Sequence, residues 1–248
     1  MPDTRPPLDL SPHDTAIFLD FDGTLAEIVD DPEAVGLAPD QLMRLGRLAQ
    51  CLDGALAVIS GRSIEQLDRF LAPLRLPLAG VHGRERRNGA GRLRGDTIDE
   101  AAIAEVANQA EAFAATRPGV LVERKPASVA IHYRTAPEFG ADVVDFAARR
   151  VAQGSGLTLL RGKMVVEIAA GHRTKGDAIA DFLREQPFAG RKPVFAGDDV
   201  TDEDGFRAIA RHDGIAIKIG PGPSEAPWRL ESPRELHGWL EDLDARWR

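Results

Sequence analysis

The chain has 248 residues, which is enough for one large domain or two small ones. Its 39 acidic and 31 basic residues leave a net charge of −8 with histidine neutral, and such an acidic surface argues against a general nucleic-acid binder because it repels the phosphate backbone. The 43% share of apolar residues excludes a disordered tail protein, which lacks the side chains for a core.

The number of cysteines and the lengths of the apolar segments exclude further classes of protein. Cys51 is the single cysteine, which excludes an internal disulfide and a cysteine-rich metal site. No stretch approaches the ~18 uncharged apolar residues of a membrane span, and the polar, proline-rich N-terminal segment lacks the apolar part of a signal peptide. We therefore expect a cytoplasmic protein, a monomer, with no membrane or nucleic-acid partner.

The two ends of the chain alternate apolar strands with helical patterns. Short apolar runs are typical of buried parallel strands, and leucines at helical spacing indicate the helices between them. Ser63, with Gln66 three residues on, predicts a capping box that opens one helix. This alternation predicts a doubly wound α/β sheet. Strands are predicted at 16–21, 55–60, within 193–199 and at 214–220, and helices at 40–50, from 63 on, around 206–210 and at 235–248.

The middle of the chain has a different pattern, an α+β order of helix, two strands, helix and two strands. We therefore predict a core made of residues 1–82 and 172–248, with an α+β domain of residues 83–171 inserted into it. Near the start of this insertion, Arg86 and Arg87 are interpreted as part of a solvated charged turn. The helices are predicted at 99–116 and 138–151, and the hairpins at 120–134 and 157–169.

The segment Asp20-Phe21-Asp22-Gly23-Thr24 directly follows the first predicted strand. A buried carboxylate is costly unless it is paired, and the carboxyl end of a parallel sheet is where α/β proteins bind ligands. Residues i and i+2 of an extended chain point the same way, so Asp20 and Asp22 could converge, with a tight turn at Gly23. Two carboxylates in a solvated turn are the alternative, and for so short a motif alone we prefer it.

A second acidic group, Gly197-Asp198-Asp199, follows a later predicted strand. Part of the acidity after it, at Asp202 and Glu203, would simply suit the first turn of a helix. Two acidic clusters at two strand ends nevertheless predict a hard cation between them. Ligation by oxygen alone, without cysteine, favours Mg²⁺ over Zn²⁺.

Two more segments supply hydrogen-bonding and positive groups. Ser60-Gly61-Arg62 lies between a strand and a helix, where a hydroxyl and backbone N–H groups suit a phosphate oxygen. Thr174-Lys175-Gly176 begins another helix, where the ammonium group can act as a point charge on phosphate. Taken singly, each has an ordinary alternative, namely a helix cap or a surface lysine.

The four segments occur in a fixed order: Asp-x-Asp-Gly-Thr, Ser-Gly-Arg, Lys-Gly and Gly-Asp-Asp. In this order the chain resembles the haloacid dehalogenase superfamily of phosphatases, whose fold is a Rossmann-like core with an inserted cap domain. From residue 16 to about 230 it resembles, more closely, the trehalose-6-phosphate phosphatase family. The segments that carry this resemblance are LDFDGTLAEI, LAVISGRS, LAGVHGRERR, HYR, VVEI, RTKGDAI, VFAGDDVTDEDGF and KIGPGPSEAPWRL.

The resemblance implies roles for the charged residues of the core. Asp20 would be the nucleophile that attacks phosphorus and forms an aspartyl-phosphate. Asp22 would protonate the leaving sugar oxygen and then deprotonate the attacking water. Lys175 would neutralise charge on Asp20 and on the phosphoryl group. Mg²⁺ would be held by the side chains of Asp20 and Asp198 and by the main-chain carbonyl of Asp22.

The resemblance also implies the substrate contacts. Thr24 and Ser60 would hydrogen-bond phosphate oxygens, and Gly61 and Arg62 are placed with them among the substrate-binding residues. Asp202 would orient bound water or the lysine and would not bind the metal directly. In the inserted domain, the residues expected to contact the sugar are Glu123, Lys125 and Glu167, whereas His132 is interpreted as packed or structural.

The activity that the resemblance implies is hydrolysis of trehalose 6-phosphate, the last step of trehalose synthesis. A phosphatase of another sugar phosphate is the alternative among enzymes, because the core motifs do not decide the sugar. A signalling module that keeps a stable phosphoaspartate is a second alternative, although the inserted domain argues against it. An inactive sugar-phosphate binder is a third, and the intact set of charged residues argues against that.

Overall fold

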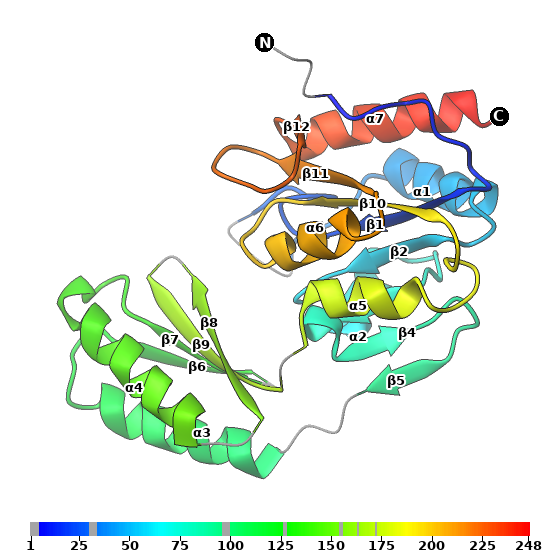
Figure 1. The fold of residues 1–248 in the computed structure, drawn as a ribbon. Helices are drawn as coiled ribbons and strands as arrows, with labels where there is room; N and C mark the ends of the chain where they lie inside the picture. The colour runs from blue at the N-terminus through cyan, green and yellow to red at the C-terminus, as the bar shows by residue number, and fades with distance from the viewer. Residues whose placement is uncertain are drawn as a thin grey trace. The chain divides into compact units, whose positions relative to one another are not determined.

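The computed structural model describes residues 5–29, 34–95, 100–125, 128–153, 156–162, 164–171 and 173–248. The chain divides into two compact units, drawn as ribbons in Figure 1. The core unit comprises Met1–Gly95 and Arg173–Arg248, and the inserted unit comprises Asp96–His172.

The core unit is built on an eight-stranded sheet in the order β12-β11-β10-β1-β2-β3-β4-β5. Neighbouring strands from β12 to β3 are parallel, and β4 and β5 add an antiparallel edge. Every residue of β1, β2 and β11 is buried, which is the pattern of strands covered on both faces. The strands are β1 (Thr15–Leu19), β2 (Leu56–Ile59), β3 (Leu78–Gly80), β4 (Glu85–Arg87), β5 (Leu93–Gly95), β10 (Lys192–Gly197), β11 (Ile215–Ile219) and β12 (Trp228–Leu230).

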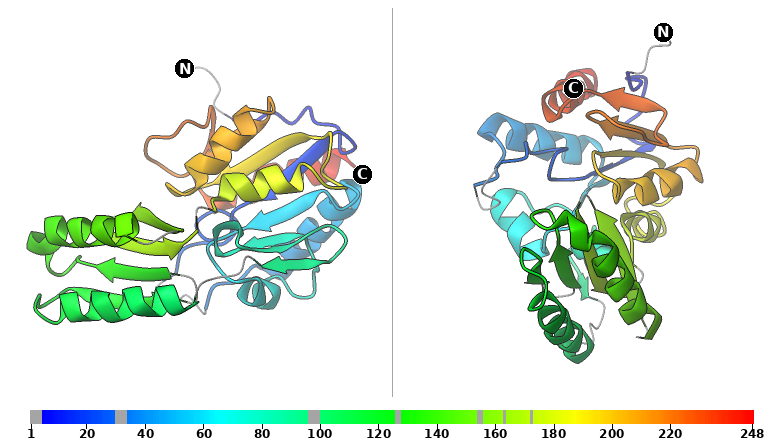
Figure 2. Two further views of the ribbon diagram at one scale, coloured as in Figure 1. Left: turned by 60° about the horizontal axis from the view of Figure 1, so that its bottom comes forward. Right: turned by 90° about the vertical axis from the view of Figure 1, so that its left-hand side faces the viewer.

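Helices cover both faces of this sheet, as Figures 1 and 2 show. On one face α5 and α6 pack side by side, and on the other lie α1, α2 and α7. Parallel strands between two helical layers confirm the predicted doubly wound α/β core. The helices are α1 (Pro39–Cys51), α2 (Ile64–Phe70), α5 (Lys175–Phe182), α6 (Asp202–Ala210) and α7 (Pro233–Arg246).

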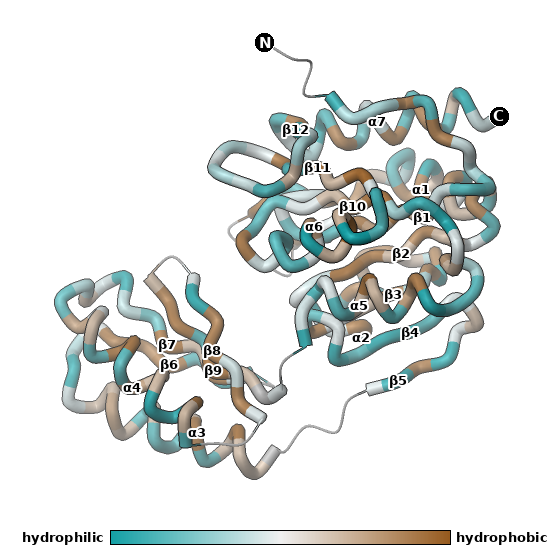
Figure 3. The backbone as a smooth tube through the Cα atoms, in the orientation of Figure 1, coloured by the Kyte–Doolittle hydropathy of each residue, from teal (hydrophilic) through white to brown (hydrophobic). Residues whose placement is uncertain are grey.

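Local sequence signals determine where several helices begin. The Ser63 hydroxyl accepts the Gln66 N–H at 3.2 Å, and the Gln66 side chain accepts the Ser63 N–H at 3.2 Å, so the predicted capping box of α2 is confirmed. Thr174 and Asp177 cap α5 in the same reciprocal way. Along α7, Figure 3 shows hydrophilic and hydrophobic positions interspersed, as expected for a helix with one buried side.

The inserted unit begins later than the sequence predicts. The predicted boundary at residue 83 lies before β4 and β5, which continue the core sheet beyond β3. The segment with Arg86 and Arg87 is therefore a strand, and the prediction of a solvated turn is wrong. Arg87 donates at 2.7 Å to each oxygen of Asp68, and Arg86 donates at 2.7 Å to Glu185, so both buried guanidinium groups are paired.

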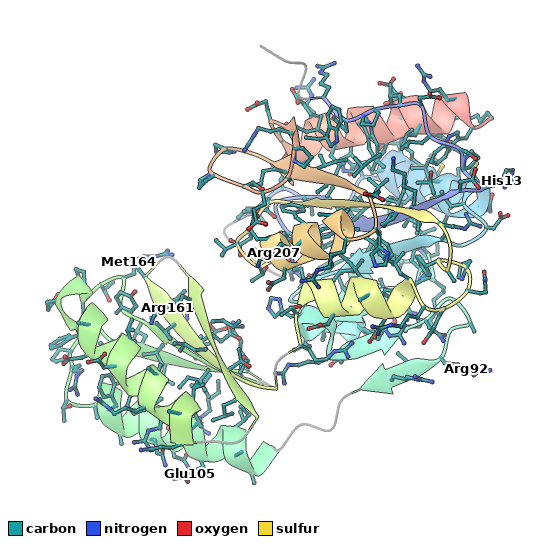
Figure 4. The ribbon with its side chains drawn as sticks, in the orientation of Figure 1. His13, Arg92, Glu105, Arg161, Met164 and Arg207 are labelled. Atoms are coloured by element: carbon teal, nitrogen blue, oxygen red, sulfur yellow. The ribbon has the colours of Figure 1, made fainter. Side chains whose placement is uncertain are left out.

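The inserted unit is a four-stranded antiparallel sheet in the order β6-β7-β9-β8, with α3 and α4 packed on it. Its order of elements confirms the predicted α+β pattern. Val129, Ile131, Val166 and Ile168 point to the helices and form a separate apolar core, and Figure 4 shows the side chains that fill this layer. Residue 172, predicted to begin the second core segment, lies outside the described residues. The elements are α3 (Glu100–Ala114), β6 (Leu121–Lys125), β7 (Ser128–His132), α4 (Gly140–Gln153), β8 (Leu157–Gly162) and β9 (Val165–Ala170).

Two expectations from composition can be compared with the structure. Cys51, at the end of α1, is half-buried and carries a free thiol. In the part of the chain that the structure describes, no helix combines the length and apolar character needed to cross a membrane. The cytoplasmic location and the monomeric state stay predictions.

Candidate active site

Three neighbouring strands of the core sheet end at one edge with polar side chains. β10, β1 and β2 lie next to one another and run parallel, so their carboxyl ends meet. Asp20 follows β1, Ser60 follows β2 and Asp198 follows β10. Doubly wound sheets bind ligands at this edge, and the fold thus brings the predicted core residues together.

Asp20 lies at the centre of a buried network of ion pairs. Its side chain is 5% exposed, and Oδ1 accepts a 2.8 Å hydrogen bond from Nζ of Lys175. The same ammonium group donates at 2.7 Å to Oδ1 of Asp202. The Thr24 hydroxyl lies 3.3 Å from Oδ2 of Asp20 and 3.1 Å from Oδ1 of Asp198, within reach of either acceptor. Lys175 therefore links the end of β1 to the start of α6.

Asp202 does more than place a favourable charge in the first turn of α6. Its side chain is fully buried, and its Oδ2 accepts the backbone N–H groups of Asp198 and Asp199 at 3.0 and 2.9 Å. A Cβ at Gly197 would lie 2.3 Å from Cγ of Asp202, so only glycine leaves room for this carboxyl group. Asp202 thus holds both the Lys175 ammonium group and the loop that presents Asp198.

The carboxylates of this network outnumber its ammonium group. Burial raises the pKa of Asp20 to about 6, although Lys175 opposes the shift. Burial, with the charge of Asp20, raises the pKa of Asp202 to about 7, and burial also raises the pKa of Asp198. Burial by itself lowers the pKa of Lys175, but the charges of Asp20 and Asp202 outweigh it and raise that pKa, so the ammonium group stays protonated. A bound cation would relieve the surplus negative charge.

The oxygen atoms of this cluster fit a hard divalent cation. One carboxylate oxygen each from Asp20, Asp198 and Asp202 lies within 4.8 Å of the others. Both oxygens of Asp202 already accept hydrogen bonds, from Lys175 and from the loop at Asp198, which leaves Asp20 and Asp198 as the better ligands. An all-oxygen donor set of this kind suits Mg²⁺.

Gly23 permits the close approach of the two acidic loops. Its φ is +76°, a conformation that glycine adopts without a steric penalty. A Cβ at this position would lie 2.3 Å from Oδ2 of Asp198. The glycine after the two aspartates is therefore needed for the turn and for the position of Asp198.

Arg62, placed by the resemblance among the substrate-binding residues, contacts a second predicted site residue in the structure. Ser60 is buried, and its hydroxyl accepts the Arg62 N–H at 3.1 Å. Between them, a Cβ at Gly61 would lie 3.0 Å from the His82 ring. The Arg62 guanidinium group donates to the Asp22 carboxylate at 2.7–3.0 Å. The structure thus brings together the predicted acid–base residue and a predicted substrate ligand. The role of the Asp22 main-chain carbonyl as a metal ligand stays a prediction.

One face of the inserted sheet, opposite the residues that contact α3 and α4, is polar. Glu123, Lys125 and Glu167 share this polar face because they alternate with the apolar core positions. Nζ of Lys125 lies 3.1 Å from Oε2 of Glu167, and the Ser128 hydroxyl donates to Oε1 of Glu167. The three predicted sugar contacts are thus gathered on one surface of the inserted unit.

His132, interpreted from the sequence as packed or structural, also lies on the polar face. Its side chain is 40% exposed, and its Nε2 lies 3.0 Å from Oε2 of Glu123. The alternation of β7 carries the missing signal, because Ser128 and His132 are separated by an even number of residues and must share a face. Ser128 has the same signal and is absent from the predicted site.

Lys218 is a further residue that sequence reasoning missed. It lies in the otherwise apolar strand β11 and is 5% exposed. Its Nζ donates to the main-chain oxygens of Asp198 and Ile219. The sequence contains a signal for this residue, which is a lysine inside an apolar strand. A buried cation needs partners, so such a lysine indicates polar acceptors nearby.

Comparison with known proteins gives a consistent result. Residues 18–234 match the family model described as trehalose-phosphatase. The chain is 43% identical over 226 residues to a trehalose-6-phosphate phosphatase of Escherichia coli, covering 91% of this chain and 85% of the relative. It is 40% identical to a probable trehalose-phosphate phosphatase of Sinorhizobium fredii, covering 92% and 87% of the two chains.

Solved structures agree. A trehalose-6-phosphate phosphatase of Aspergillus fumigatus superposes with a TM-score of 0.73 at 27% identity, covering 94% of this chain and 93% of the other. A haloacid dehalogenase-like hydrolase of B. subtilis superposes with a TM-score of 0.65 at 14% identity, over 92% of this chain and 98% of the other, a likeness of fold. The chain belongs to the trehalose-phosphatase family, on the haloacid dehalogenase-like fold.

Proposed function

We propose that this chain hydrolyses trehalose 6-phosphate to trehalose and inorganic phosphate in two steps, with Mg²⁺ and through an aspartyl-phosphate. The observation that carries the proposal is the buried Asp20 carboxylate, held by Lys175 beside Asp198 at the ligand-binding edge of the sheet. The relatives that bear the name of this activity support the choice of substrate.

In the first step a carboxylate oxygen of Asp20 attacks phosphorus, and the bond from phosphorus to the sugar oxygen breaks. The leaving oxygen takes a proton from the Asp22 carboxyl group. In the second step water attacks the same phosphorus and gives a proton to Asp22, which releases phosphate and restores Asp20. In both steps the hydroxyl groups of Thr24 and Ser60 hydrogen-bond phosphate oxygens; the contacts of Thr24 with Asp20 and Asp198 support this role.

Charge is the main obstacle to the first step, because two anions must meet. At ~4 Å each pair of unit charges repels by roughly 4 kcal/mol at an effective dielectric constant near 20. Lys175 offsets part of this repulsion by contacting Asp20 directly. Mg²⁺ held by Asp20, Asp198 and the Asp22 carbonyl would supply the remaining positive charge. Asp202 keeps the ammonium group and the metal-binding loop in place.

We assign sugar recognition to the polar face of the inserted unit. Its carboxylates accept hydrogen bonds from sugar hydroxyls, and its ammonium group donates to them. Lys125 contacts Glu167 and Glu123 contacts His132, so donors and acceptors lie side by side on this face. Such a set of neighbouring donors and acceptors suits a ligand with many hydroxyl groups.

The proposed activity is tested by measuring phosphate release from trehalose 6-phosphate. We expect rapid release with Mg²⁺, no release after treatment with EDTA, and recovery when Mg²⁺ is restored, because the surplus negative charge then has no counter-ion. Glucose 6-phosphate serves as the control substrate and should react much more slowly. Equal rates on both substrates would contradict disaccharide specificity, and full activity in EDTA would contradict the metal.

The turn at Gly23 gives a second test. Alanine at this position requires a positive φ and meets Asp198, so we expect turnover to fall by about 10²-fold as that ligand is displaced. Gly91→Ala is the matched control, because φ is +75° there and a Cβ would meet nothing within 4 Å. It should keep full activity at a cost of about 1 kcal/mol in stability. Similar turnover in both variants would contradict the claim that the site needs glycine at position 23.

A further inference from the structure

The Arg62 guanidinium group makes bidentate hydrogen bonds to the Asp22 carboxylate. Nε lies 3.0 Å from Oδ1 and 2.8 Å from Oδ2, and Nη2 lies 2.7 Å from Oδ1. The Arg62 side chain is 12% exposed, whereas that of Asp22 is 39% exposed. A largely buried guanidinium group therefore holds a carboxylate that solvent can reach. Bidentate contact of this kind fixes the orientation of a carboxylate as well as its position.

Arg62 is itself held firmly. Its Cζ lies 4.9 Å from the centre of the Phe70 ring and 5.8 Å from that of Phe21, and these two rings stack on each other at 5.7 Å. Its backbone N–H donates to Ser60 Oγ at 3.1 Å, and its carbonyl accepts the Val81 N–H at 2.9 Å. Both ends of this residue are therefore fixed to the core unit.

Asp22 needs such a support. It lies in the turn after β1, next to a glycine with positive φ, and its side chain is partly exposed. A half-exposed carboxylate on a turn would otherwise rotate in solvent. Proton transfer requires the donor to lie within hydrogen-bond reach of the reacting oxygen, so the orientation of this group affects the rate directly.

We propose that Arg62 is a positioning residue for Asp22 and that it acts on the reaction through that carboxylate instead of binding phosphate. The inference rests on the proposed function, in which Asp22 exchanges a proton with the sugar oxygen and with water. The Nε and Nη2 edge of the guanidinium group is occupied by the two oxygens of Asp22, so a phosphate could not use that bidentate edge while the contact is kept. In this proposal the positioning role takes the place of the predicted role of Arg62 as a substrate ligand.

The first test separates turnover from binding. In Arg62→Ala we expect kcat on trehalose 6-phosphate to fall by about 10²-fold, while KM and the inhibition constant of inorganic phosphate change by less than about threefold. Arg47→Ala is the matched control, because Arg47 grips Asp244 with the same atoms, at 2.6–3.2 Å, between α1 and α7. It should leave all three constants near those of the wild type.

The second test uses the leaving group. p-Nitrophenyl phosphate departs as a stable phenolate and needs no proton, so the ratio of kcat on trehalose 6-phosphate to kcat on this ester should fall at least about tenfold in Arg62→Ala. Asp22→Asn should lower the ratio in the same way. The double variant should be no slower than Asp22→Asn, because the two residues act as one unit. Arg62→Lys, which lacks the planar fork, should recover little.

Different outcomes contradict different statements. A rise in KM and in the phosphate inhibition constant by tenfold or more, with equal losses on both substrates, would make Arg62 a phosphate ligand and overturn the inference. Multiplicative losses in the double variant, or full recovery with lysine, would also overturn it. A wild-type chain that releases no phosphate from trehalose 6-phosphate would contradict the proposed function itself.

Discussion

Asp20→Asn is expected to lose hydrolysis of trehalose 6-phosphate by at least about 10⁴-fold, because the amide removes the attacking oxygen anion. No aspartyl-phosphate should form when the variant is mixed with substrate and quenched. Asp14→Asn is the matched control, since Asp14 is an exposed carboxylate that precedes the opposite end of β1. It should be as active as the wild type.

The stability of Asp20→Asn distinguishes a chemical role from a structural one. Burial and the neighbouring charge of Asp198 disfavour the Asp20 carboxylate and raise its pKa, so removing this charge should leave the midpoint of thermal unfolding unchanged or higher. Lys175 keeps its bond to Asp202 in the variant. Undiminished activity would show that Asp20 is not the nucleophile. Loss of activity together with loss of the folded state would indicate a structural role for Asp20 and contradict the expectation of unchanged stability.

Lys175→Met has the largest expected effect on stability. The substitution leaves Asp20 and Asp202 buried without their cation, and breaking a buried pair in this way costs about 3–5 kcal/mol. We expect the free energy of unfolding, measured with urea at pH 8, to fall by that amount, and phosphate release to fall at least about 10³-fold. Lys192→Met, at the exposed start of β10, is the control and should change neither quantity.

The pH dependence of Lys175→Met has a definite sign. The substitution leaves the carboxylates of Asp20 and Asp202 without their cation. Burial is the main cause that raises the pKa of both groups above 3.8 in the folded wild type, to about 6 for Asp20 and about 7 for Asp202. The native state therefore binds more protons than the unfolded state, and stability is lost as pH rises through these values. The deficit relative to the wild type should be smaller at pH 5 than at pH 8. A deficit that grows on acidification would contradict this account of the network.

A double variant checks the same account. Adding Asp202→Asn to Lys175→Met removes one of the buried charges and should recover part of the lost stability. It should recover no activity, because the group that neutralises Asp20 is still absent. Recovery of turnover would show that Lys175 serves only to compensate Asp202.

Much of the core site is predictable from local pattern. Asp20 and Asp198 each follow an apolar run, and parallel strands place such ends at one edge of a sheet. The capping residues of α2 and α5 are likewise recognisable, because a cap involves residues only three apart. The family resemblance then assigns roles to these positions that spacing alone leaves open.

The error at the start of the insertion has one cause, which is that the sequence around a charged residue does not show which residue will pair with it. Arg86 and Arg87 have the composition of a solvated turn, yet Glu185 and Asp68 pair with them inside the core unit. Strand β4 pairs with β3, and β5 with β4, along the core sheet, so the insertion starts beyond residue 83.

Periodicity and strand-end chemistry, which short windows contain, together with the order of four motifs along the chain, therefore predict the layered architecture and the residues of the core site. The assignment of ion partners belongs to the folded chain. Arg62 meets Asp22 across 40 positions, and Lys175 meets Asp20 across 155. Electrostatic energy depends on distance in space and on burial, neither of which a linear order of residues contains.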